Sequence, residues 1–239
     1  MCKDQDERTG TAMRTFVVSD AHGYPGLIAN ALEHGAFRPG EDGFVYAGDL
    51  LDRGPDSEGC LELVERLATE VLFGNHEAAV LLDFPVFPQN SISPGFRLLF
   101  ADKLFRPCPV PWKVATCVEG VVVTHAGVSQ DWAEAFHREC LDDPHLLAEH
   151  LNEEFLEAAL AAIEGGAGEW EETGVLGWDG PLWFRPGGMT GRPLADCTQI
   201  AGHTPPLEDE EESGESGFYL IDPDTRFGCL LYTSPSPRD

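Results

Sequence analysis

The sequence predicts an α/β protein whose functional residues gather at one edge of a sheet. Between residues 15 and 73, short apolar runs alternate with segments of helical spacing in the order β-α-β-α-β. Several of the apolar runs lead directly into a polar block that contains Asp, Asn or His. Strands of an α/β sheet bring the loops at their carboxyl ends into one crevice, so we expect these blocks to meet.

The elements of this first part follow from residue spacing. Helical spacing is clear where Cys60, Leu61, Val64 and Leu67 recur every three or four residues and form a core-facing stripe. The expected elements are strands at 15–19, 44–47 and 71–73 and helices at 24–34 and 57–68.

The middle of the chain predicts loops and helices around one further strand. Residues 84–111 are rich in Pro and Phe and are expected to form a loop with a short helix near 96–104. A strand is expected at 121–124, followed by two helices within 131–163, where apolar residues recur on one stripe.

The last part of the chain sets the expected domain limits. Strands are expected at 199–201, 218–221 and 227–232, and the acidic segment 208–216 is expected to be a disordered loop. We expect one domain over residues 14–232, with an insertion of helices and aromatic residues at about 128–195. Residues 1–13 are expected to be a mobile lead-in. Residues 233–239 are expected to be an unstructured tail whose composition resembles a cloning scar.

Charge and cysteine content limit the partners. The 239 residues include 42 acidic and 15 basic side chains, for a formal net charge of −27. A field this negative repels nucleic acid and anionic membranes, so neither is an expected partner. No apolar run approaches the roughly 18 residues of a membrane span. Seven cysteines without a Cys-x-x-Cys pair favour reduced thiols in a cytoplasmic protein over a disulfide framework.

Five polar blocks carry the chemistry. They are Asp20-Ala21-His22-Gly23, Gly48-Asp49-Leu50-Leu51-Asp52-Arg53-Gly54, Gly74-Asn75-His76-Glu77, Thr124-His125-Ala126-Gly127 and Gly202-His203-Thr204. Their carboxylate, amide and imidazole groups suit Mn, Fe, Zn or Mg rather than soft metals. The set indicates a two-metal hydrolase.

In order and content the blocks resemble the phosphoprotein phosphatases of the calcineurin-like metallophosphoesterase superfamily, which also includes diadenosine tetraphosphatases. The resemblance implies a sandwich of two mixed β-sheets flanked by helices, and two divalent metal ions, with Mn favoured. It implies Asp20, His22 and Asp49 as ligands of one ion and Asp49, Asn75, His125 and His203 as ligands of the other. Ser19 replaces the family's usual Gly, and Asp222-Pro223 departs from the family's last strand.

The resemblance also implies a mechanism. A hydroxide held between the two ions attacks phosphorus in line, and His76 protonates the leaving oxygen. Asp52 is expected to keep His76 protonated, and Glu77 to cap the following helix rather than to orient His76. Arg53 and Arg185 are the expected phosphate-binding residues, and Arg192 competes with Arg185 for its role.

The substrate is less constrained than the chemistry. Phosphomonoesters are expected, first of all protein phosphoserine or phosphothreonine. A dinucleoside polyphosphate is the alternative, which Trp170, Trp178 and Trp183 keep open although packing is the favoured role of these rings. A catalytically silent scaffold is disfavoured because every ligand position is filled. The remaining histidines, expected to be surface or packing residues, are His34, His137, His145 and His150.

Overall fold

The computed structural model describes residues 13–165, 174–187, 191–206, 217–223 and 231–233. The predicted acidic segment 208–216 and Trp170 lie outside the described residues, as do 1–12, 227–230 and 234–239.

Five strands form the first sheet, in the order β4-β3-β2-β1-β9. β1, β2, β3 and β4 run parallel to one another, and β9 at the edge of the sheet runs antiparallel to β1. Their bounds are β1 Thr15–Val18, β2 Gly43–Tyr46, β3 Glu70–Leu72, β4 Trp112–Lys113 and β9 Leu231–Thr233.

Four strands form the second sheet, in the order β5-β6-β7-β8. β5 is antiparallel to β6, and β6, β7 and β8 are parallel. Their bounds are β5 Ala115–Val118, β6 Val121–Thr124, β7 Gln199–Ala201 and β8 Phe218–Leu220. Both sheets are mixed, so the predicted α/β fold with two mixed sheets is confirmed.

Alternation along the strands explains why the sheets stack. Val17 of β1 packs with Val123 and Ile200 of the second sheet in a core between the sheets. Its neighbours Phe16 and Val18 belong instead to the larger core that includes residues of the helices. Successive side chains of a strand point to opposite faces, so each sheet buries both faces.

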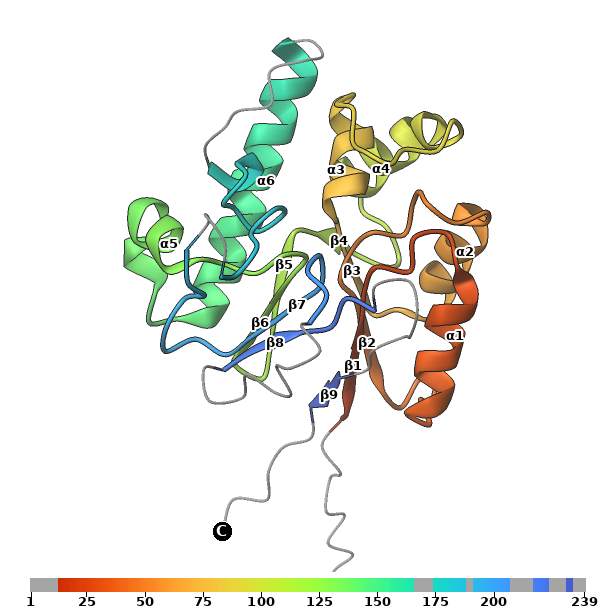
Figure 1. Cartoon of the computed structure of the whole chain (residues 1–239), viewed down its shortest axis with the longest axis horizontal. Coiled ribbons are helices and arrows are strands. Elements are labelled where there is room, and N and C mark those ends of the chain that lie inside the picture. Colours follow the sequence, from red (N-terminus) through yellow and green to blue (C-terminus); the bar gives the residue numbers. More distant parts are fainter. Residues whose placement is uncertain (1–12, 166–173, 188–190, 207–216, 224–230, 234–239) are drawn as a thin grey trace, which may run out of the picture.

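Helices cover the outer faces of the sandwich (Figure 1). α1 and α2 lie beside the first sheet, and α6 packs on β5 of the second. Their bounds are α1 Pro25–His34, α2 Ser57–Leu67, α3 Asn75–Leu82, α4 Arg97–Phe105, α5 Gln130–Phe136 and α6 Pro144–Gly165, with short 3-10 turns η1 Ser93–Phe96, η2 Arg138–Cys140 and η3 Gly174–Leu176.

The structure adds elements that the sequence pattern did not predict. β5 and β6 form a hairpin whose two turn residues, Glu119 and Gly120, both have positive φ (51° and 83°). This pair of left-handed residues is the geometry of a tight hairpin turn. β4 was also not predicted, and α3 was expected only as a helix of unstated bounds that Glu77 would cap. Thr233, predicted to begin the tail, lies in β9 and pairs with Thr15 of β1. Among the described residues, none of the helices has the length and apolar character needed to cross a membrane.

Candidate metal centre

The six predicted ligand residues follow the carboxyl ends of five strands. Asp20 and His22 follow β1, Asp49 follows β2, and Asn75 follows β3. His125 and His203 follow β6 and β7 of the second sheet. Both sheets therefore contribute side chains to one place, as expected for the strand ends of an α/β fold.

The backbone is constrained at this place. Ten non-glycine residues of the described chain have positive φ, and six of them are predicted site residues: Asp20, His22, Asp49, Asp52, Arg53 and His203. Such conformations are unfavourable for residues with a Cβ and cluster at functional sites. Gly74 and Gly202 are also required, because a Cβ there would collide with the carboxylates of Asp49 and Asp20.

Asp49 lies at the centre of the cluster. Its Oδ2 is 3.3 Å from Nε2 of His22, 3.5 Å from Nε2 of His125 and 4.0 Å from Nε2 of His76. Its Oδ1 accepts a hydrogen bond of 3.1 Å from the backbone N–H of His76, in the first turn of α3. Burial opposes ionisation of Asp49, but the imidazoles of His125, His76 and His22 hold its pKa well below the usual range.

Two of the imidazoles turn a bare nitrogen toward Asp49. Nδ1 of His22 donates to the carbonyl oxygen of Leu51 (2.7 Å), and Nδ1 of His125 donates to that of Ala47 (2.9 Å). Because a carbonyl only accepts, Nε2 of each ring faces the cluster with its lone pair when the ring is neutral. Burial lowers the pKa of His22 to about 4, which keeps that ring neutral at pH 7.

His203 and Asn75 complete the set. His203 is buried, and burial lowers its pKa well below the ordinary value. Within the described part of the chain, Nε2 of His203, like Nε2 of His22, has no hydrogen-bond partner. The side-chain amide of Asn75 lies 2.9 Å from Nε2 of His125, where its NH2 group can donate to that nitrogen and to the carboxylate of Asp49. A cation in the cluster would give a partner to the bare Nε2 atoms of His22 and His203.

The charges give a second reason for a cation. Burial and the carboxylates of Asp222 and Asp49 raise the pKa of Asp20 well above its ordinary value. Buried carboxylates this close disfavour each other's ionised form, and bound cations reverse that effect. The donor set of carboxylates, a carboxamide and imidazoles therefore fits divalent metal ions.

His76 and Asp52 form a buried pair beside this cluster. Nδ1 of His76 is hydrogen-bonded to Oδ2 of Asp52. The other oxygen of Asp52 accepts from the backbone N–H of Asn90 (2.7 Å) and from the hydroxyl of Ser93. Burial alone would lower the pKa of His76, but the carboxylates of Asp49 and Asp52 outweigh it and raise that pKa.

Glu77 holds the loop that carries Asp49. Its carboxylate is fully buried and accepts from four backbone N–H groups: Asp49 (2.8 Å), Leu50 (2.8 Å), Leu51 (3.2 Å) and Gly74 (3.0 Å). The bond from Gly74 is the predicted cap of α3. The three bonds to the Asp49 loop were not predicted. Burial and the charge of Asp49 raise the pKa of Glu77 to about 7.

Two arginines lie near the cluster. Arg53 is exposed, and its charge helps to lower the pKa of His22. Nη1 of Arg185 donates to the backbone oxygen of His203 (2.9 Å). For Arg192, the competitor for the role of Arg185, the structure gives a backbone contact: its carbonyl oxygen accepts from the N–H of Gln130 at the start of α5 (2.8 Å).

An aromatic pair also borders the cluster. The ring of Trp183 contacts His203 edge-on, with centroids 5.8 Å apart, and packs against Trp178 at 4.7 Å. Trp178 is about half exposed, at 48%. These rings therefore lie beside the predicted ligands, although packing was their favoured role.

Several residues of the site could not be assigned from the sequence. Asn90 and Ser93 hold Asp52 from positions about forty residues away, and Asp222 approaches Asp20 from the other end of the chain. Of the supporting residues Glu77, Asn90, Ser93 and Asp222, only Glu77 belongs to one of the five polar blocks, Gly-Asn-His-Glu.

The family profile described as calcineurin-like phosphoesterase matches residues 13–224. The chain belongs to this family. The family resemblance of the five blocks is therefore confirmed.

Two bacterial proteins match parts of the chain. A symmetrical bis(5'-nucleosyl)-tetraphosphatase of Aggregatibacter actinomycetemcomitans is 29% identical over 60% of this chain and 55% of its own. Serine/threonine-protein phosphatase 1 of Salmonella typhimurium is 42% identical over 28% of this chain and 31% of its own. The chain thus spans about half the length, or less, of these curated relatives.

Solved structures support the fold. A cold-active protein-tyrosine phosphatase of a psychrophilic Shewanella species superposes with a TM-score of 0.59. The superposition covers 93% of this chain and 76% of the other at 17% identity. At this identity the likeness concerns the fold alone.

Proposed function

We propose that this protein is a metal-dependent phosphoesterase that hydrolyses phosphomonoesters at the cluster around Asp49. The observation that carries the proposal is the convergence of three imidazole Nε2 atoms on one carboxylate oxygen, at 3.3 to 4.0 Å. Asp20, His22 and Asp49 would hold one divalent ion. Asp49, Asn75, His125 and His203 would hold the other, with Asp49 shared. When bound, such ions supply positive charge for the phosphoryl oxygens and lower the pKa of water.

His76 is the proposed general acid. Its Nδ1 is occupied by Asp52, so the proton it can deliver is the one on Nε2. Nε2 lies 4.0 Å from Oδ2 of Asp49, so that proton faces the metal cluster. The pair with Asp52 keeps the ring protonated and oriented until the leaving oxygen takes the proton.

Arg53 and Arg185 are the proposed phosphate-binding residues. Arg53 is close enough to His22 to affect its pKa, and Arg185 bonds to the backbone of His203. Guanidinium groups in these places can pair with two oxygens of a phosphoryl group held between the ligand residues.

Phosphoserine or phosphothreonine of a protein is the proposed substrate. A protein with a net charge of −27 and few Lys and Arg is poorly suited to a polyphosphate chain. The match to serine/threonine-protein phosphatase 1 supports this choice, but it covers only 28% of the chain.

A specific observation favours a second candidate, a dinucleoside polyphosphate. Trp183 contacts the proposed ligand His203 and, with Trp178, offers an aromatic surface on which a base could stack. The match to a symmetrical bis(5'-nucleosyl)-tetraphosphatase also covers more of the chain, at 60%.

One assay panel tests the proposal and separates the candidates. The purified chain is given p-nitrophenyl phosphate, a phosphoserine peptide and diadenosine tetraphosphate, each with Mn and with Mg. We expect p-nitrophenyl phosphate hydrolysis only with a divalent ion, highest with Mn, and a higher kcat/KM on the peptide than on the dinucleotide. The reverse order selects the second candidate. Full activity after verified removal of all metal contradicts the proposal itself.

A further inference from the structure

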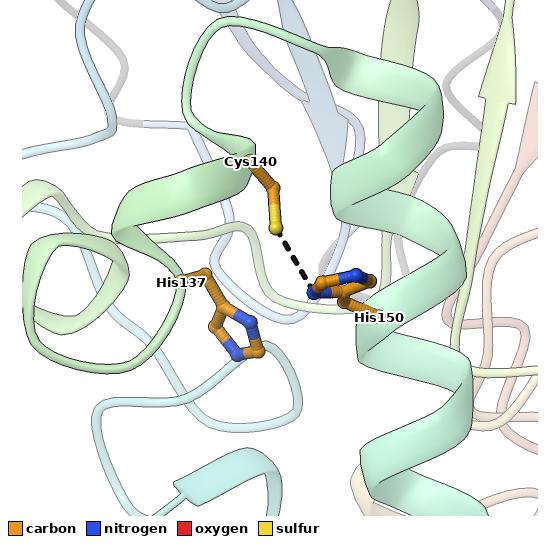
Figure 2. A group of neighbouring side chains, drawn as sticks. All are labelled: His137, Cys140 and His150. Carbon is orange, nitrogen blue, oxygen red and sulfur yellow. Dashed lines mark hydrogen bonds between the residues drawn. The ribbon is translucent and has the colours of Figure 1, made fainter.

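Three side chains with metal-binding atoms meet away from Asp49, where α5 joins α6. His137 directly follows α5, Cys140 ends η2, and His150 lies on α6. One ring nitrogen of each histidine and Sγ of Cys140 all lie within 4.8 Å of one another. Figure 2 shows Cys140 and His150 pointing toward one another, with the ring of His137 beside them.

The cluster is largely withdrawn from solvent. Cys140 is fully buried, His137 is 5% exposed, and His150 is intermediate. Sγ of Cys140 lies 3.0 Å from Nδ1 of His150. A thiol and two imidazoles, all metal-binding groups, are thus gathered in one place with little access to water.

Carboxylates flank the cluster on two sides. Oε2 of Glu154 lies 2.9 Å from Nε2 of His137, which leaves the other ring nitrogen of His137 as a ligand. Metal-binding histidines commonly pair their second nitrogen with a carboxylate in this way. Oε1 of Glu139 lies 3.9 Å from Nδ1 of His150. The two negative charges would offset the charge of a divalent ion.

We propose that His137, Cys140 and His150 bind one zinc ion, with the carboxylate of Glu139 in the fourth position. Thiolate and imidazole together favour zinc, whereas the oxygen-rich cluster around Asp49 suits harder ions. Ligand atoms of a tetrahedral zinc site lie about 3.3–3.8 Å apart, so the present separations require only small rotations. Zinc replaces the proton of the Cys140 thiol, which is released to solvent, and nothing is oxidised or reduced.

A zinc ion bound by His137, Cys140 and His150 would also affect the metal centre around Asp49. Glu154, which holds His137, also accepts from the backbone N–H of Val175 in η3 (2.9 Å). The chain continues from η3 to Trp183 and Arg185, which contact His203. A zinc ion here would join η2 to α6 and thereby fix the segment that brings Trp183 and Arg185 to the metal centre.

Metal analysis of the full chain tests the site separately from the Asp49 centre. The wild-type protein, Asp49→Asn, Cys140→Ser and the control Cys197→Ser, another buried free thiol, are loaded with zinc and dialysed against metal-free buffer. We expect Asp49→Asn to retain one zinc per chain at the cluster of His137, Cys140 and His150. Cys140→Ser should bind one zinc fewer than the wild type. Cys197→Ser should match the wild type. Failure of the proposed phosphoesterase function would leave this zinc unchanged.

Cobalt supplies a readout that does not depend on the folding of a variant. Cobalt-loaded wild-type protein should show a thiolate-to-cobalt charge-transfer band in the near ultraviolet, and Asp49→Asn should keep it. Cys140→Ser should lose the band, and Cys197→Ser should retain it. Absence of the band in the cobalt-loaded wild type, or its persistence in Cys140→Ser, overturns the proposal. The contact between Cys140 and His150 would then be a hydrogen bond without a metal ion.

Discussion

Nδ1 of His76 is hydrogen-bonded to Oδ2 of Asp52, and both side chains are almost entirely buried. The second oxygen of Asp52 is held by Asn90 and Ser93, so the carboxylate cannot turn away. The imidazole is therefore fixed with Nε2 toward Asp49. This relationship separates the proposed acid from the proposed metal ligands and makes the two roles testable by different variants.

Replacing His76 should slow the reaction without removing metal. In His76→Asn the leaving oxygen has no acid, so kcat should fall by roughly 10²–10⁴-fold. Steady-state kinetics and metal analysis are measured on the same sample. Asp49→Asn is the comparison, and it should lose metal as well as rate. If His76→Asn also loses its metal, His76 is a ligand and the assigned role is wrong.

Glu77 should be required for the shape of the Asp49 loop. In Glu77→Gln one side-chain oxygen becomes an N–H group, which faces backbone N–H groups that previously donated to the carboxylate. Leaving such a buried group unsatisfied costs on the order of 1–3 kcal/mol. We expect a lower free energy of unfolding and weaker metal binding. Glu62→Gln, on the exposed side of α2, is the matched control and should change neither. Equal metal affinity in wild type and Glu77→Gln would show that the loop does not depend on Glu77.

The two arginines should contribute to phosphate affinity. Loss of a charge-assisted contact amounts to roughly 1.5–3 kcal/mol, so Arg53→Ala and Arg185→Ala should each weaken inhibition by inorganic phosphate roughly 10- to 100-fold. Arg192→Ala should change the inhibition constant much less. A larger effect of Arg192→Ala than of Arg185→Ala would show that Arg192, and not Arg185, binds the phosphate.

A salt bridge far from the site should give a pH-dependent stability. Asp42 accepts from Nε (3.1 Å) and Nη2 (2.7 Å) of Arg14, and these bonds lower the pKa of Asp42 from 3.8 to about 2. A carboxyl whose pKa is lowered by folding stabilises the folded state above its unfolded pKa, and this stabilisation is lost as the pH falls through the folded pKa.

Arg14→Ala should therefore lower the urea midpoint at pH 7, and the difference from wild type should shrink as the pH falls from about 4 toward 2. Arg66→Ala, an exposed arginine of α2, is the control and should show little effect at either pH. A deficit in Arg14→Ala that stays constant down to pH 2 would mean that the salt bridge does not contribute.

The sequence predicted the parts of the site that depend on local order. Asp49 and Asn75 each follow a buried strand by a few residues, so strand order alone brings them to one edge. The contacts of Asp52 with Asn90 and Ser93 depend on how residues 84–96 fold back, and no spacing rule encodes that path. The same limit applies to His137 and His150, which were expected to be surface or packing residues. Their proximity to Cys140 depends on the contact between η2 and α6, which no spacing in the sequence indicates.

The missed secondary structure has a different cause. β4 contains only Trp112 and Lys113, too few residues to show any alternation. The β5–β6 hairpin turns at Glu119-Gly120, and only the Gly of that pair is a common signal for such a turn. The bounds of α3 carry no periodic signal, because all eight of its residues are buried and no polar face alternates with an apolar one.

The most direct test of the central claim is the anomalous scattering from a crystal of the manganese-loaded protein. The account predicts two peaks about 3.5–4 Å apart, with an oxygen of Asp49 bonded to both. His22 and Asp20 should bind one ion, and Asn75, His125 and His203 the other. A single ion, or two ions of which neither contacts Asp49, would contradict the account.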